Sequence, residues 1–260
     1  MSAPLVRTPQ RSAIYEALAI MEERGIQHLA VEDDAGRVCG IVEIRDLLTF
    51  PSYGPIVLTR EVAQAQSAED VVNTTRRAPR LAKALLDSGG QVQRVTRMIT
   101  AVCDAATERF VALAQEQLGP PPASFVFIGL GSQGREEQVL SSDQDNALIF
   151  SDEAGASADA TAYFRELGAL VCRWLDAAGY PYCAGGVMAQ NPKWCQPLSV
   201  WKEYFSGWVR RAQPEEVREF SIFFDLRAIT GSGELADELR AHVLRTAVAH
   251  APFLAQLAGD

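Results

Sequence analysis

One segment, residues 129–146, concentrates the residue types and spacings that could do chemistry. It ends in Asp143 and Asp145, and side chains two apart on a strand project to the same face. Two neighbouring carboxylates repel each other and need a cation between them to stay ionised. A hard divalent ion such as Mg²⁺ takes oxygen ligands and keeps positions for water and substrate phosphates. We therefore predict that Asp143 and Asp145 form a Mg²⁺ site.

A glycine-bearing loop lies just upstream of this pair. Gly131 and Gly134 have no Cβ, so the backbone there can approach a ligand closely. Loop N–H groups and the Ser132 hydroxyl can hold a triphosphate, and Arg135 adds a forked, always-charged donor. Either feature alone is more often a turn or a solvated strand end. The two in order, after a buried strand, predict a functional site.

Short strands and helices must position these residues. Phe125–Ile128 has the apolar pattern of a buried strand, and a second strand is predicted from Asn146 to Phe150. A helix is predicted over 158–178. Tyr180–Met188 is predicted as a third strand, after which residues 198–212 and 233–249 have helical patterns. The same pattern over 81–118 is broken at Gly89-Gly90 and ended at Gly119–Pro122.

Residues 12–50 are predicted to form a smaller unit with the order helix, strand, turn, strand, helix. Ser12 is expected to cap the first helix and Gly25 to end it. The strands are expected at His28–Val31 and Val38–Ile44, and a further helix begins at Arg45–Leu48.

Composition excludes several classes of function. The 260 residues carry a net charge of −9, which argues against a nucleic-acid phosphate backbone as the partner. Five cysteines without a C-x-x-C pair indicate reduced thiols and a cytoplasmic location, and three scattered histidines argue against a zinc site. No apolar run approaches the ~18–20 residues of a membrane helix, and the N-terminus lacks a signal-peptide pattern.

The runs Gly131–Glu136 and Ser142–Asp145 resemble the signature of the nucleotidyltransferase superfamily. They are similar to the uridylyltransferase that modifies the PII signal protein, and closer still to a bacterial family of nucleotidyltransferases that follow CBS domains. Gly185–Trp194 and Phe224–Gly231 resemble that same family, so the resemblance covers about residues 80–260.

The resemblance implies an α/β (α+β) fold, with a polymerase beta-like core whose short mixed sheet is flanked by helices. It implies that Gly131 and Ser132 contact the nucleotide phosphates and that Asp143 and Asp145 bind Mg²⁺. The metal would polarise the α-phosphate for in-line attack by an acceptor hydroxyl. We expect Mg²⁺-dependent transfer of a nucleoside monophosphate from an NTP to an acceptor, a signalling protein as in the uridylyltransferase.

The sequence departs from the family in one respect. Many such enzymes have a third carboxylate on the next strand, and Tyr180–Val187 has none. Asp225 is a candidate replacement, although an ion pair with Arg227 is the interpretation we favour. The missing acid leaves open a non-catalytic, nucleotide-sensing regulatory module, and a purely structural dimerisation unit is a third possibility.

The run from Tyr15 to Leu48 resembles one CBS motif. Such motifs work in pairs that bind adenosine nucleotides, and Asp46 matches the position that accepts the ribose hydroxyls. Glu43 stands where Thr or Ser is usual, and its carboxylate would repel a phosphate. We expect His28 to be a packed strand residue. The missing half of the pair could come from a second chain, giving a homodimer, or the chain is a fragment of a longer protein.

Five regions follow from these patterns. They are a single CBS motif over 1–50, a connector with at most one short helix over 51–80, a helical segment over 81–118, a nucleotidyltransferase core over 119–195 and a C-terminal helical region over 196–260.

The aromatic cluster around Trp194 and Trp201 is expected to be core. The C-terminal region looks shorter than that of the family, as it would in a piece of a longer protein.

Overall fold

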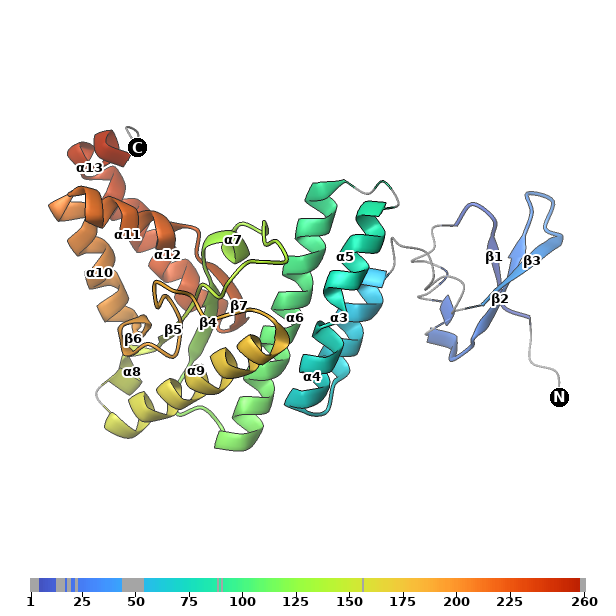
Figure 1. Cartoon of the computed structure of the whole chain (residues 1–260), viewed down its shortest axis with the longest axis horizontal. Helices are drawn as coiled ribbons and strands as arrows, with labels where there is room; N and C mark the ends of the chain where they lie inside the picture. Colours follow the sequence, from blue (N-terminus) through green and yellow to red (C-terminus); the bar gives the residue numbers. More distant parts are fainter. Residues whose placement is uncertain are drawn as a thin grey trace. The chain divides into compact units, whose positions relative to one another are not determined.

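The computed structural model of the chain describes residues 5–12, 17, 20–21, 23–43, 54–87, 89, 91–155 and 157–257. Contacts divide the chain into two compact units, Met1–Val57 and Leu58–Asp260. Each unit is described by itself (Figure 1).

The larger unit contains, in its described part, a four-stranded mixed sheet with the strand order β6-β5-β4-β7. The central strand β4 is antiparallel to both β5 and β7, while β5 is parallel to β6. The bounds are Phe125–Gly129 for β4, Asn146–Phe150 for β5, Cys195–Pro197 for β6 and Arg227–Gly231 for β7.

Helices cover this sheet on both faces (Figure 1). The helices that the structure describes have the bounds Gly54–Gln64 for α3, Ala68–Thr75 for α4, Ala78–Asp87 for α5, Val92–Leu118 for α6, Gly131–Gly134 for α7, Asp152–Gly155 for α8, Ala158–Ala178 for α9, Leu198–Arg211 for α10, Pro214–Phe224 for α11, Gly233–Val248 for α12 and Ala251–Leu257 for α13. The mixed sheet flanked by helices confirms the predicted fold class.

Strict alternation along the two central strands explains the two helical layers. Phe127 and Leu148 pack on one side with α6 and α9, in the same cluster as Phe110 and Phe164. Ile128 and the other alternate residues face the opposite side, where α10, α11 and α12 pack. Because every residue of β4 and β5 is buried, both faces of the sheet need cover.

The larger helices lie close to where the sequence predicts them. Helix α9 has the predicted bounds, and α10 and α12 differ from them by one residue at their C-terminal ends. The expected break separates α5 from α6, and Gly119 ends α6 at a positive φ of 88°. The buried aromatic residues Trp194 and Trp201 confirm the expected core cluster.

Three local expectations were wrong. Residues 51–80, expected to be an irregular connector, contain α3, α4 and the start of α5, because apolar residues at helical spacing pack against α6. Tyr180–Met188 forms a loop rather than a third strand, and the strand beside β5 is β6. Residues 227–231, to which no strand was assigned, form the edge strand β7.

The smaller unit contains, in its described part, a three-stranded sheet with the order β1-β2-β3. Its strands are Arg7–Pro9 for β1, His28–Glu32 for β2 and Val38–Glu43 for β3. Asp33 fixes the turn between β2 and β3, since its Oδ1 accepts hydrogen bonds from the N–H groups of Ala35 and Arg37. Ala17 and Met21 pack on Leu29, as an N-terminal helix requires.

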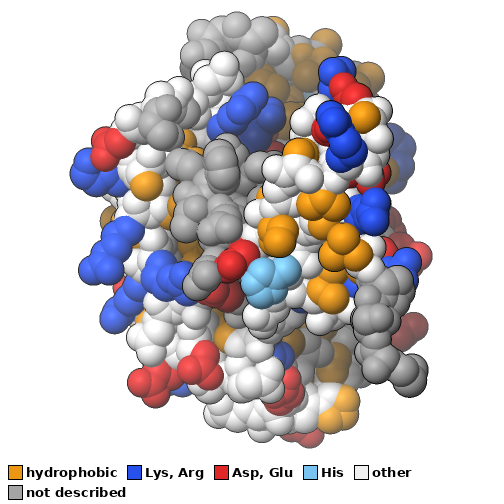
Figure 2. Space-filling model, turned by 90° about the vertical axis from the view of Figure 1, so that its right-hand side faces the viewer, with side chains coloured by type: hydrophobic (Ala, Val, Ile, Leu, Met, Phe, Trp, Pro, Cys, Tyr) orange, Lys and Arg blue, Asp and Glu red, His pale blue; other side chains and the backbone are white. Residues whose placement is uncertain are grey.

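Strand β3 presents apolar side chains to solvent. Ile41 is 68% exposed and Val38 is 47% exposed, and Figure 2 shows hydrophobic side chains gathered on this side of the molecule. His28, expected to be packed, has a side chain that is 61% exposed and lies 3.4 Å from Glu43 across the strand pair. Asp46, the predicted ribose contact, and the helix expected from Arg45 lie outside the described residues.

None of the described helices combines the length and apolar character that crossing a membrane would need.

Gly168 on α9 offers a test of how tightly the helix and the following loop approach each other. An added Cβ would lie 2.5 Å from the carbonyl oxygen of Ala189. Gly168→Ala should therefore destabilise the chain, because overpacking costs about 1–3 kcal/mol against a gain of at most ~1 kcal/mol in helix propensity. Gly233→Ala, where nothing lies within 4 Å of the new Cβ, is the control. Equal denaturation midpoints for the two variants would contradict this packing.

Candidate active site

The turn between β4 and β5 begins with Gly131 in a conformation that favours glycine. Its φ is +51°, and an added Cβ would lie 3.0 Å from the Asp145 Oδ2 atom. The N–H group of Leu130 donates to the carbonyl oxygen of Asp145 at 2.9 Å, which ties the two ends of the loop together. The absence of a side chain at Gly131 therefore lets the Asp145 carboxylate lie against the turn.

Two buried polar residues anchor the segment that leads into β5. The side-chain amide of Gln144 donates to the carbonyl oxygens of Cys172 and Tyr180, each at 2.9 Å. The Asn146 side-chain oxygen accepts from the N–H group of Ala189 at 2.8 Å. Because successive side chains alternate in extended backbone, these inward amides place the two neighbouring aspartates on the open side. The sequence pattern predicts the two aspartates on a strand. In the structure they lie just before β5.

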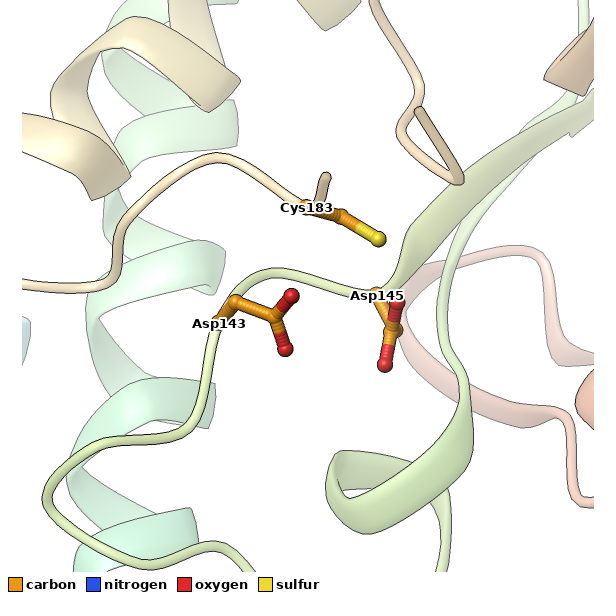
Figure 3. A group of neighbouring side chains, drawn as sticks. All are labelled: Asp143, Asp145 and Cys183. Atoms are coloured by element: carbon orange, nitrogen blue, oxygen red, sulfur yellow. The ribbon is translucent and has the colours of Figure 1, made fainter. Parts of the chain in front are cut away.

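Asp143, Asp145 and Cys183 form a group whose potential ligand atoms all lie within 4.8 Å of one another. Each of the three side chains is half-buried. Figure 3 shows the thiol of Cys183 and the carboxylate of Asp143 both directed towards Asp145. Cys183 comes from the loop after α9, so the group joins two segments that are far apart in sequence.

Cys183 was not among the site residues predicted from the sequence. A third carboxylate was the ligand expected in Tyr180–Val187, and the cysteines show no C-x-x-C pair that would indicate a metal site. The signal that could have found it was the resemblance of the following run, Gly185–Trp194, to the same family, which marked this loop as part of the site.

The electrostatics of the pair suit a cation. Burial raises the pKa of Asp145. The hydrogen bond from Cys183 and the charge of Arg135 oppose that rise, whereas the charge of Asp143 adds to it. The ionised carboxylate pair is therefore costly without a counter-charge, and a bound divalent ion would relieve that cost. The two carboxylates supply the oxygen donors that Mg²⁺ prefers, so the residues present fit such an ion.

Arg135 and Asp225 pair with each other. The Arg135 Nη1 atom lies 2.8 Å from Asp225 Oδ2, and its Nε donates to Glu137 at 3.0 Å. The expected pairing of Asp225 with Arg227 was therefore wrong, and Asp225 does not join the three-residue group found among the described residues. Gly134 is needed for packing, since an added Cβ would clash with the Asp225 carbonyl oxygen.

Arg227 instead links the turn to α6. Its Nη2 atom donates to the Gln133 carbonyl oxygen at 2.9 Å and to the Asp104 carboxylate at 2.8 Å. The buried side chain of Gln133 donates to the same carboxylate at 3.0 Å. Burial raises the pKa of Asp104, which the hydrogen bond from Gln133 and the charge of Arg227 counteract. This network fixes α7 to α6 and β7.

Two protein-family models match this chain. Residues 76–215, more than half of the chain, match the family model described as "Putative nucleotidyltransferase DUF294". The chain belongs to this family. A CBS domain model matches residues 1–53. Both matches confirm the predicted resemblance to CBS-linked nucleotidyltransferases. The DUF294 match contains the turn at Gly131, the aspartate pair and Cys183, and it supports a nucleotidyltransferase-like function.

A curated relative adds little to this assignment. The Methanopyrus kandleri protein named "Uncharacterized protein MK0525" is 30% identical over 66 residues, which cover 25% of this chain and 34% of that protein. The chain thus matches about a third of that relative's length, and the relative's name states no activity.

Replacing Asp145 by Asn should stabilise the metal-free protein, because it removes a half-buried charge that faces a second carboxylate. The raised pKa of Asp145 means that the folded state loses stability as pH rises from the ordinary carboxyl range through this raised value. We expect the melting temperature of Asp145→Asn at neutral pH to exceed that of the wild type. The difference should vanish in acid, where wild-type Asp145 is protonated in both states. A lower melting temperature for the variant at neutral pH would contradict the interpretation.

Proposed function

We propose that the chain is a Mg²⁺-dependent nucleotidyltransferase that transfers a nucleoside monophosphate from an NTP to an acceptor hydroxyl. The observation that carries the proposal is the close approach of Asp143 to Asp145, and of Asp145 to the turn at Gly131. Membership of the DUF294 family supports the class of reaction.

In this proposal the two aspartates hold the metal ion and the turn holds the triphosphate. Gly131, Ser132 and Gln133 begin α7, and the first N–H groups of a helix have no partner within it. These groups are therefore available to phosphate oxygens, as is the Ser132 hydroxyl. The Arg135 guanidinium is exposed but already paired with Asp225 and Glu137, so it would contact the nucleotide from within that ion-pair network.

The reaction forms a bond between the acceptor oxygen and the α-phosphorus atom. The bond from that phosphorus to the oxygen bridging the β-phosphate breaks, and pyrophosphate leaves with its electrons. The proton of the acceptor hydroxyl passes to solvent. A bound divalent ion supplies Lewis-acid polarisation of the phosphate and charge neutralisation. The side chains of Gln144 and Asn146 keep the carboxylates in place while the substrates exchange.

We further propose a protein acceptor in a signalling pathway and uridylyl transfer as the reaction. These two details rest on the resemblance of Gly131–Glu136 and Ser142–Asp145 to the uridylyltransferase that modifies the PII protein.

Substitution of the aspartates tests the function. Asp143→Asn and Asp145→Asn should each lower NTP-dependent pyrophosphate release by at least about 100-fold, because each removes a charged ligand of a metal that stabilises the transition state. Isothermal titration should also show weakened Mg²⁺·NTP binding. Asp87→Asn, which removes an exposed carboxylate paired with Lys83 on α5, is the control and should leave both unchanged. Wild-type-like binding by both site variants would rule the function out.

A nucleotide-sensing module without catalysis is the second candidate. It is favoured by the composition of the group, in which a thiol and not a third carboxylate completes the set among the described residues. Incubation with labelled NTPs, Mg²⁺ and candidate acceptor proteins discriminates the two. Aspartate-dependent binding without pyrophosphate release or labelled acceptor would favour the sensor.

We also propose that the CBS unit pairs with that of a second chain. A single CBS motif requires another, and the exposed side chains of Val38 and Ile41 on β3 offer an apolar contact surface. Ile41→Lys should shift the mass measured by light scattering from dimer to monomer. Val248→Lys, at a side chain that is 73% exposed on α12, is the control. A wild-type protein that is monomeric at high micromolar concentration would contradict the pairing.

A further inference from the structure

We propose that Cys183 is a sulfur ligand of the metal site, which then holds thiophilic divalent ions such as Zn²⁺ or Cd²⁺ through two aspartates and one cysteine. The inference rests on the metal site of the proposed function and adds a ligand and a metal preference to it.

The position of the thiol carries the inference. The Cys183 sulfur lies within 4.8 Å of a carboxylate oxygen of each aspartate, and those two oxygens lie within 4.8 Å of each other. One ion between the three atoms could contact all of them, since zinc lies ~2.3 Å from sulfur and ~2.0–2.2 Å from oxygen ligands. Figure 3 shows the sulfur directed into the space beside Asp145 rather than away from it.

The loop around Cys183 is held in place. The Gln144 N–H group donates to the Pro181 carbonyl oxygen at 2.9 Å, and the Gly186 N–H group donates to that of Cys183 at 3.0 Å. The Asn191 side chain donates to the Gly186 carbonyl oxygen at 3.0 Å. The thiol thus comes from a loop whose backbone is bonded both within itself and to the segment that carries the aspartates.

Cys183 also differs from the other cysteines of the chain. Cys103, Cys172 and Cys195 are buried, and Cys39 is exposed on β3 of the smaller unit. Cys183 is the half-buried thiol that lies beside potential ligands. This contrast provides an internal control, because Cys39 is accessible but is not part of the group.

The donor set determines which ions it favours. Mg²⁺ binds oxygen and gains little from sulfur, whereas thiolate ligands select softer ions such as Zn²⁺ and Cd²⁺. On coordination the thiol releases its proton to solvent and binds as thiolate. The two carboxylates and the thiolate then carry three negative charges in total, and these face the divalent ion. We infer that a thiophilic ion competes with Mg²⁺ for this position.

Titration of the full-length protein with Cd²⁺ tests the ligand directly. Wild type and Cys39→Ser should both develop the ultraviolet absorption of sulfur-to-cadmium charge transfer, and Cys183→Ser should not. The Cd²⁺ dissociation constant of Cys183→Ser should rise by at least about tenfold, since even residues outside the ligand sphere contribute ~10- to 100-fold. Retention of the absorption and of the affinity in Cys183→Ser would overturn the inference.

A second measurement needs no variant and so does not depend on folding. Cd²⁺ should slow alkylation of Cys183 in the wild-type protein, mapped by mass spectrometry, while alkylation of Cys39 proceeds unchanged. Equal rates with and without the ion would also overturn the inference.

Mg²⁺·NTP binding on the same preparations separates this inference from the proposed function. Cys39→Ser should bind Mg²⁺·NTP like the wild type, because Cys39 is not part of the group. If Cys183→Ser binds Cd²⁺ like the wild type, the sulfur ligand is excluded and the function stands. If Asp143→Asn and Asp145→Asn keep Mg²⁺·NTP binding, the function fails whatever the cysteine does.

Discussion

The site depends on holding two like charges close together. Asp143 and Asp145 have oxygen atoms within 4.8 Å of each other, and Asp145 lies against the turn at Gly131. Such a pair is unfavourable by itself, since burial and mutual repulsion both oppose ionisation. Its geometry must therefore be imposed by the surrounding fold, and a cation is the ligand that would convert the repulsion into attraction.

Buried amides rather than charges impose that geometry. Gln144 and Asn146 direct their side chains inwards and bond to backbone groups of α9 and the following loop. These bonds fix the segment without adding a cation that would compete with a metal. Arg227 pairs with Asp104 and also donates to the Gln133 carbonyl oxygen of the turn. Because the side chains of Gln144 and Asn146 are buried, each of them needs its hydrogen-bond partners.

Local patterns predicted the elements that carry the site. The buried runs of β4 and β5 and the amphipathic helix α9 follow from residues close in sequence, as does the aspartate pair. Partnerships across the chain did not follow. Arg135 pairs with Asp225 across 90 residues, and Arg227 reaches Asp104 across 123. An Asp and an Arg two residues apart looked like a local ion pair, but Asp225 pairs with Arg135 and Arg227 pairs with Asp104.

The position of Cys183 in the site was also not predictable from local sequence patterns. The loop that carries it was predicted as a strand because aromatic and apolar residues run from Tyr180 to Met188. The chain instead turns at Gly186, whose φ is +68°, and the loop is held by Asn191. A strand would have continued along the sheet edge, whereas this turn brings the thiol beside the carboxylates. The chemistry of the third position is therefore decided by a loop conformation, which neither apolar periodicity nor a search for carboxylates could detect.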